Sequence, residues 1–318
     1  LVGGEGFAVD ASVIEANASR FQRVKGSEVE WTEEQLVRRP VREYLSALES
    51  DNPPTNPKQK PKAMSPTDPT AAWTARGRNK IMFGYSLNYL MDMEDAVIVD
   101  VEATPTRISK EVDATETMIE RTEDRFGLKP DRLAGDVAYG TGEMLGWLVE
   151  RNITPYIPVW DQSRVAAEGK FVRADFDYNK ERDLYVCPGG KELRTSGTAH
   201  DGTTIKYIAK RIDCSGCPLK PNCTTGRERR ISRDVNQEAR DHAQALMETD
   251  AYYQSGVDRK QIERLFGEAK NILSMVRLRL RGLSGAKEEF LLTATVQNLK
   301  RLANHSTTPP PQPQPMVA

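Results

Sequence analysis

Three acidic residues stand in local settings that suit metal-dependent chemistry. Asp10 lies in a strand-like run of small and β-branched residues, and Asp136 lies in a second run of this kind. Glu263 lies in an amphipathic stretch that is typical of a helix. Two aspartates on strands and a glutamate on a helix supply the oxygen ligands that divalent cations prefer beside a phosphate. The set predicts metal-dependent phosphoryl transfer, if folding unites residues that lie far apart in the chain.

Two basic residues flank the glutamate at helical spacing. Arg259, Glu263 and Lys270 follow one another at intervals of four and seven positions, which places them on one face of a helix. In a phosphoryl-transfer site, Glu263 would bind metal, while Arg259 and Lys270 would contact phosphates of the substrate and limit carboxylate repulsion. Spacing alone favours instead an ordinary row of surface ion pairs, each worth roughly a few tenths of a kcal/mol.

The four cysteines form a second candidate site. Cys214 and Cys217 are spaced to bring two thiolates to one ion, and Cys187 opens a Pro-Gly-Gly turn. With Cys223 they are the possible ligands of a structural Zn²⁺ ion. Reduced free thiols and disulfides are the alternatives, and a reducing cytoplasm disfavours the disulfides. Such a site would present nearby basic residues, Arg229 and Arg230 among them, to DNA.

Periodicity and turn residues predict the elements that must position these groups. The expected elements, in chain order, are a strand over 6–16, a helical piece after a capping box of Thr32 and Gln35, another over 41–48 beyond an interruption at Pro40, an antiparallel hairpin of 80–89 and 96–104, a helix over 110–126 closed by Gly127, the strand of Asp136, a helix over 141–151 and a strand over 154–159. This order predicts an α/β fold, namely a ribonuclease H-like mixed sheet flanked by helices.

Four parts of the chain are expected from this order. They are a first part of the catalytic core over 1–160 with a proline-rich loop at 50–69, a Cys-containing β-rich insertion over 161–234, a helical completion of the core over 235–305, and a disordered tail over 306–318. The proline density of the loop is too high for a regular helix or a central strand. We expect the loop to be a linker or mobile.

Composition narrows the class of protein without identifying it. The 318 residues carry a net charge of −1, which neither requires nor excludes a nucleic-acid partner. The distribution of charge is more informative than the sum. The stretch 259–301 holds ten Lys or Arg, Arg264 among them, against four Glu, so a polyanion is expected to bind there. No apolar run is long enough to span a bilayer, and no signal peptide is present, so we expect a soluble cytoplasmic protein. The first residue, Leu1, suggests that an upstream segment is missing.

The sequence lacks the residues that several other classes of enzyme need. The only histidines, His200, His242 and His305, stand in unrelated contexts, so hydrolytic triads and histidine-rich zinc sites are poorly supported. Glycine-rich phosphate loops are absent from the sequence, so ATP use is not indicated. The four tryptophans, including Trp160, are expected mostly in the core or at interfaces.

The first two acidic positions resemble motifs of a known family. The run 9–18 is similar to the first catalytic strand of DDE transposases of bacterial insertion sequences, an Asp-Gly-Thr followed by an aliphatic pair and Glu-Ala-Asn. Here Ala11 and Ser12 replace the glycine and threonine. Asp136, followed shortly by Tyr139, resembles the second catalytic strand of the family.

The helical motif completes the resemblance. Arg259, Glu263 and Lys270 reproduce the Arg-x3-Glu-x6-Lys spacing of several transposase groups, with Gly256 at the place of the tyrosine that precedes the arginine. The resemblance spans the chain from Phe7 to about residue 303. It implies a ribonuclease H-like catalytic region in which Asp10, Asp136 and Glu263 hold Mg²⁺ or Mn²⁺.

The implied activity is cleavage at transposon ends followed by strand transfer to target DNA. The implied partner is double-stranded DNA, bound by a homodimer, in the bacterial cytoplasm at the nucleoid. Two alternatives remain: a catalytically inactive DNA-binding protein derived from a transposase, and a ribonuclease H-like nuclease without strand transfer. Salt-dependent DNA binding without nicking would favour the former.

Overall fold

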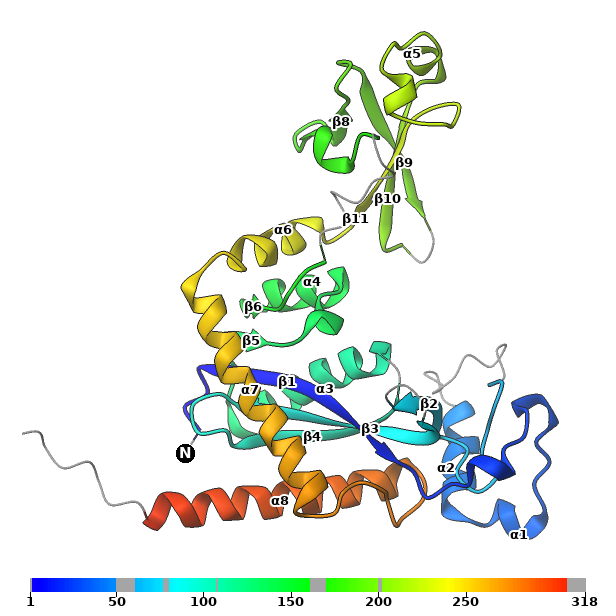
Figure 1. Ribbon diagram of the computed structural model, residues 1–318, viewed down its shortest axis with the longest axis vertical. Coiled ribbons are helices and arrows are strands. Elements are labelled where there is room, and N and C mark those ends of the chain that lie inside the picture. Colours follow the sequence, from blue (N-terminus) through cyan, green and yellow to red (C-terminus); the bar gives the residue numbers. More distant parts are fainter. Residues whose placement is uncertain are drawn as a thin grey trace, which may run out of the picture. The chain divides into compact units, whose positions relative to one another are not determined.

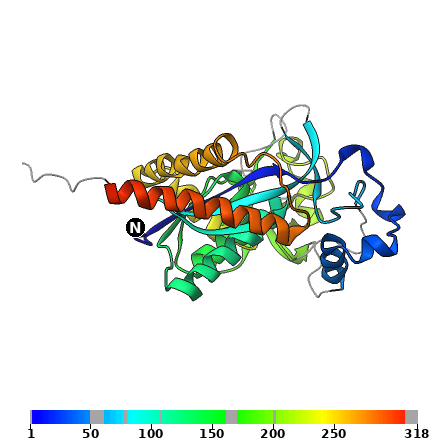
Figure 2. The same ribbon diagram turned by 90° about the horizontal axis from the view of Figure 1, so that it is seen from below.

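The computed structural model describes residues 2–49, 61–76, 80–106, 108–160, 170–199 and 202–307 (Figures 1 and 2). The chain forms two compact units, and each is described by itself. Unit 1 comprises Leu1–Gly135 and Gln254–Ala318, and unit 2 comprises Asp136–Tyr253. The predicted boundaries at 160 and 234 stay a prediction.

Unit 1 is built on a mixed sheet with one long central strand. Its strands are β1 (Gly6–Glu15), β2 (Ala72–Arg76), β3 (Lys80–Asp92), β4 (Ile98–Pro105) and β5 (Arg132–Ala134). Strand β3 pairs antiparallel with β1, β2 and β4, while β1 also pairs parallel with β5. In this register Asp10 lies opposite Tyr89. Phe7, Ala8 and Val9 are fully buried, which explains why the start of β1 is apolar on both faces.

Helices flank this sheet. They are α1 (Glu33–Leu36), α2 (Arg39–Leu48), α3 (Ile108–Phe126), α7 (Asp250–Asn271), whose greater part belongs to unit 1, and α8 (Leu283–Thr307), with the short 3-10 helices η1 (Arg20–Gln22) and η2 (Gly26–Glu28). Both α3 and α8 pack against β4. On α3, Arg121 binds Asp100 and Glu102 of β4 at 2.7 Å each. A mixed sheet flanked by helices is consistent with the predicted ribonuclease H-like fold.

Local sequence signals fixed several element ends as expected. The antiparallel hairpin of β3 and β4 is confirmed, as is the capping box of Thr32 and Gln35. Gly127, at a φ of 65°, follows the last residue of α3, where a side chain would be strained. The predicted interruption between two helical pieces is confirmed, because α1 ends at Leu36 and α2 begins at Arg39. Pro40 lies just after the break, in the first turn of α2, where a proline removes no needed donor.

The described end of the proline-rich stretch is not a free linker. Met64 pairs with Val24 through backbone hydrogen bonds, and Ser65 and Asp68 are buried. Residues 61–69 form no helix or strand, as the prolines predict, but they are not a linker, because Ser65 and Asp68 pack into unit 1. Positions 50–60 lie outside the described residues, as do 308–318 of the predicted disordered tail.

Buried Asp68 gives unit 1 a pH-dependent stability. Burial raises the pKa of its carboxyl from 3.8 to about 6, although the Tyr85 hydroxyl donates a hydrogen bond to Oδ1 at 2.6 Å. Since the pKa is higher in the folded state, the stability is full below about pH 4 and falls as the pH rises to about 6. The loss is on the order of 3 kcal/mol.

Asp68→Asn is expected to remove this loss. Between pH 4 and pH 7, the free energy of unfolding of the variant should rise relative to the wild type by about 3 kcal/mol, measured by urea denaturation. Asp113→Asn, at an exposed carboxylate paired with Lys110, is the matched control and should leave the pH dependence unchanged. Equal pH dependence of Asp68→Asn and wild type would contradict the assignment.

Unit 2 combines a helical part with an antiparallel sheet. Its elements are η3 (Val137–Tyr139), α4 (Gly142–Glu150), β6 (Thr154–Tyr156), η4 (Arg173–Asp175), β7 (Asp177–Asn179), β8 (Leu184–Val186), β9 (Glu192–Ala199), β10 (Thr204–Ala209), α5 (Arg211–Ser215), η5 (Lys220–Asn222), β11 (Arg230–Asp234) and α6 (Gln237–Leu246). The sheet has the order β11-β10-β9-β8-β7, and α4 packs against α6. Leu193 and Tyr207 are fully buried in the core of the sheet.

The β-rich character of this region was expected from the sequence, whereas its origin as an insertion stays a prediction. The predicted strand over 154–159 is shorter in the structure and ends at Tyr156. Among the described residues, no helix combines the length and the apolarity that a bilayer-crossing segment needs.

Candidate active site

Strand β1 and helix α7 carry the predicted site residues of unit 1. Asp10 lies on β1, as predicted, and its Oδ1 accepts a hydrogen bond from the N–H of Ala11 at 2.8 Å. Glu263 lies on α7, as predicted, with its side chain 58% exposed. Helix α7 crosses the sheet near β1 (Figure 1).

Apolar packing fixes α7 in place. Phe266 is buried and stacks on Tyr89 of β3, with ring centroids 5.0 Å apart and an angle of 16°. The buried Gln297 of α8 joins both elements, because its Nε2 donates to the Leu265 carbonyl and its Oε1 accepts from the Tyr89 hydroxyl, each at 2.9 Å. Tyr89 lies opposite Asp10 in the register of β3 and β1. The packing of Phe266 on Tyr89 therefore positions α7 over the part of β1 that carries Asp10.

One guanidinium group joins the two carboxylates of unit 1. Arg259 Nη1 lies 3.2 Å from Asp10 Oδ2, and Arg259 Nη2 lies 3.4 Å from Glu263 Oε1. The side chains of Asp10 and Arg259 are 17% and 20% exposed, so this pair is partly shielded from water. Folding thus brings together two of the three predicted acidic residues, which are separated by about 250 positions in the chain.

The lysine of the motif also reaches β1. Lys270 Nζ donates to the hydroxyl of Ser12 at 2.5 Å, two residues beyond Asp10. All three residues of the helical motif therefore point towards the same strand or towards each other. A simple row of surface ion pairs along α7 does not describe this arrangement, because Arg259 and Lys270 both contact a strand far away in the sequence. Ser12 is a contact that spacing within the helix could not reveal.

The third acidic residue belongs to unit 2. Asp136 was predicted on a strand, but β5 ends at Ala134, and Asp136 is the N-terminal capping residue of η3. Its Oδ1 accepts the N–H of Ala138 at 2.8 Å, and Tyr139 at the end of η3 is buried. The strand prediction is wrong by two residues, because the side chain of Asp136 stabilises a turn of 3-10 helix that stops the extended chain.

The three other predicted DNA contacts differ in their surroundings. Arg264 is exposed on α7. Arg230 is exposed and binds Glu228 at 2.6 Å. Arg229 donates to the carbonyls of Cys223 and Phe171, at 2.8 and 3.0 Å, so its guanidinium supports the fold of unit 2. A role of any of them in DNA binding stays a prediction.

The four cysteines are free thiols close to one another. Burial raises the pKa of the Cys223 thiol, and the neighbouring thiols of Cys214, Cys187 and Cys217 raise it further. Cys187 Sγ accepts the N–H of Lys191 at 3.3 Å. Within the described parts of the chain, no three or more His, Cys, Asp or Glu side chains are grouped so that they could hold a metal ion, and this holds for the predicted acidic ligands as well as for the cysteines. The predicted zinc site is therefore not supported, and Cys187, Cys214 and Cys223 pack beside the core of the sheet.

Comparison with known protein families gives a match to part of the chain. Residues 186–303, a little over a third of the chain, match the family model of a transposase DDE domain. The matched stretch contains α7 with Arg259, Glu263 and Lys270, but neither Asp10 nor Asp136. No curated protein matches the chain. The match supports a DDE transposase family.

Proposed function

We propose that the chain is a DNA transposase that cleaves the phosphodiester bond at transposon ends and joins the freed 3′-hydroxyl to target DNA. The carrying observation is the convergence of Asp10 and Glu263 on Arg259, in a region that overlaps the matched transposase domain at the helical residues. Phosphoryl transfer needs charge neutralisation and positioned oxygen ligands more than a protein nucleophile, and no hydrolytic triad competes for the assignment.

The two carboxylates of unit 1 fit a divalent cation in their chemistry. Both offer oxygen atoms, and both contact the guanidinium of Arg259, which offsets repulsion between them. Asp10 and Glu263 would hold Mg²⁺ or Mn²⁺, with Asp136 as the third ligand. Such an ion supplies charge neutralisation at the phosphate and lowers the pKa of the attacking water.

The remaining residues would bind and orient the DNA. Arg259 keeps the carboxylates of Asp10 and Glu263 from repelling each other while the site is empty of DNA. Lys270, held beside Ser12, would contact a phosphate next to the scissile bond, where an ammonium acts as a point charge. Arg264, Arg229 and Arg230 would add phosphate contacts that position the duplex without reading its sequence. Two copies of the chain, one on each transposon end, would act together.

The test is a cleavage and joining assay on a duplex that carries the ends of the chain's own genetic element. In Mg²⁺ we expect 3′-hydroxyl nicks at the ends and products covalently joined to target DNA, and in EDTA neither. Salt-dependent binding without nicking would instead identify an inactive DNA-binding protein. Nicks without joined products would identify a nuclease that lacks strand transfer.

A further inference from the structure

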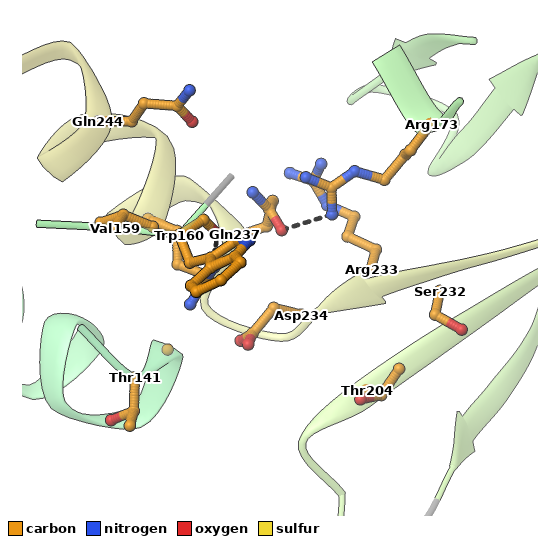
Figure 3. Close-up of a pocket in the computed structure, with 12 residues that line it drawn as sticks. Thr141, Val159, Trp160, Arg173, Thr204, Ser232, Arg233, Asp234, Gln237 and Gln244 are labelled. Atoms are coloured by element: carbon orange, nitrogen blue, oxygen red, sulfur yellow. Dashed lines mark hydrogen bonds between the residues drawn. The ribbon is translucent and has the colours of Figure 1, made fainter. Parts of the chain in front are cut away.

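Unit 2 contains an open cleft of about 370 Å³ beside β11 and α6. Its lining includes Trp160, Arg173, Arg233, Asp234, Gln237 and Arg240 (Figure 3). Three arginines against one aspartate make the lining positively charged. None of these residues belongs to the catalytic set proposed above.

Trp160 supplies an exposed aromatic surface at this cleft. The sequence led us to expect a core or interface residue, yet Trp160 is 68% exposed. Its backbone is fixed, because Arg240 Nη2 donates to the Trp160 carbonyl at 3.1 Å and Arg240 Nη1 donates to the Gly140 carbonyl at 3.0 Å. Trp160 and the buried Gln237 both line the cleft (Figure 3). A large ring that remains in water on a fixed support is a platform for stacking.

Two arginines, Arg173 and Arg233, also line this cleft (Figure 3). Arg173 Nη1 donates to Oε1 of the buried Gln237 at 2.8 Å, and Gln237 is itself held by a bond from its Nε2 to Asp241 Oδ1 at 2.7 Å. The Arg233 guanidinium lies 3.9 Å from the centre of the Tyr178 ring, and its Nη1 lies 3.3 Å from the Tyr185 hydroxyl. Both cations are thus held in position before any ligand arrives.

Asp234, the one acidic residue of the lining, stabilises the local fold. Asp234 Oδ1 accepts the N–H of Asn236 at 2.9 Å. The carboxylate also lies against Gly142, the first residue of α4, where a Cβ atom would collide with it. A carboxylate at the start of a helix is stabilised by the helix dipole. Asp234 therefore organises the wall of the cleft and leaves the arginines as the groups that face an anion.

We propose that this cleft binds one nucleotide of an unpaired DNA strand. Its base would stack on Trp160, while Arg173 and Arg233 would bind the adjoining phosphates. The lining residues match the two parts of a nucleotide. An indole ring can stack on any base, and guanidinium groups bind phosphate oxygens. In a duplex both faces of each base are already stacked, so only an unpaired base can use the ring. The inference rests on the proposed function, since it makes this subsite part of DNA-end handling.

The test measures binding of a fluorescent oligothymidylate to the full chain by anisotropy in EDTA, where cleavage cannot occur. Trp160→Ala is expected to weaken binding about ten- to a hundredfold. Arg173→Ala should weaken binding and reduce the slope of log K against log salt by about one. Arg173→Lys, which retains the charge, should recover much of the affinity and serves as the second variant, because Arg173→Ala leaves Gln237 without its donor. The Trp160→Phe variant keeps an aromatic ring and should still bind the oligonucleotide. Its intrinsic tryptophan fluorescence should be quenched much less than that of the wild type when unlabelled oligonucleotide is added, because the stacked indole is gone.

The controls replace residues of the same type outside the cleft. They are Tyr253→Ala, at a ring that is 74% exposed, and Arg182→Ala, at an arginine paired with Glu192. Both should bind within a factor of two of the wild type. The proposal is overturned if the wild type does not bind the oligonucleotide, if Trp160→Ala binds as the wild type does, or if duplex binding is equally sensitive to Trp160→Ala. Because no cleavage is measured, inactivity of the wild type in the joining assay would refute the transposase function without changing this result.

Discussion

Replacement of Glu263 by glutamine is expected to abolish strand cleavage in Mg²⁺, with a rate reduced at least about a hundredfold. Glutamine keeps the size of the side chain but removes the negative charge that would hold a cation. The fold should remain, because the Glu263 side chain is 58% exposed and its contact with Arg259 is long, at 3.4 Å. The change in the free energy of unfolding should therefore stay within about 0.5 kcal/mol. The measurement is a single-turnover nicking rate on the end-containing duplex.

The other carboxylates and one control complete this experiment. Asp10→Asn and Asp136→Asn should show losses of similar size, each with DNA binding retained. Asp258→Asn is the matched control, since Asp258 lies on the same helix and its Oδ1 accepts a hydrogen bond from Gln254, a residue of α7 itself, at 2.9 Å. It should cleave within a factor of two of the wild type. Any of the three acidic residues whose replacement leaves the rate unchanged is not part of the site.

Truncation of Phe266 to alanine is expected to lower the free energy of unfolding by about 3–5 kcal/mol. The ring is buried between α7 and β3, and its stacking on Tyr89 adds to the transfer free energy of the apolar surface. Since Phe266 fixes the helix that carries Glu263, cleavage should also decrease at temperatures where the variant is still folded. Urea denaturation followed by far-UV circular dichroism measures the stability.

An exposed phenylalanine provides the comparison for this variant. Phe21 is 79% exposed, so Phe21→Ala should change the free energy of unfolding by no more than about 0.5 kcal/mol. If Phe266→Ala cost less than about 1 kcal/mol, the packing of α7 on β3 would not be what holds the glutamate in place.

Local rules account for the parts of the structure that the sequence predicted well. The hairpin of β3 and β4 follows from strand-forming residues on both sides of a turn, and the ends of α1, α3 and α4 follow from Thr32, Gly127 and Thr141. The spacing of Arg259, Glu263 and Lys270 placed these residues on one helix. Each of these signals acts within a few residues, where backbone hydrogen bonding and steric limits decide the conformation.

Contacts between distant segments decided the rest. The sequence could name Asp10 and Arg259 separately, but only the packing of Phe266 on Tyr89 brings the guanidinium to the aspartate. The end of the proline-rich stretch became part of the core, and Trp160 stayed exposed to solvent. The sequence could predict neither result, because burial depends on which surfaces meet in the folded chain. The residue types thus defined the chemistry that is available to this chain, and the tertiary structure selected which groups share a site, since hydrophobic burial is a property of the whole fold and not of any local pattern.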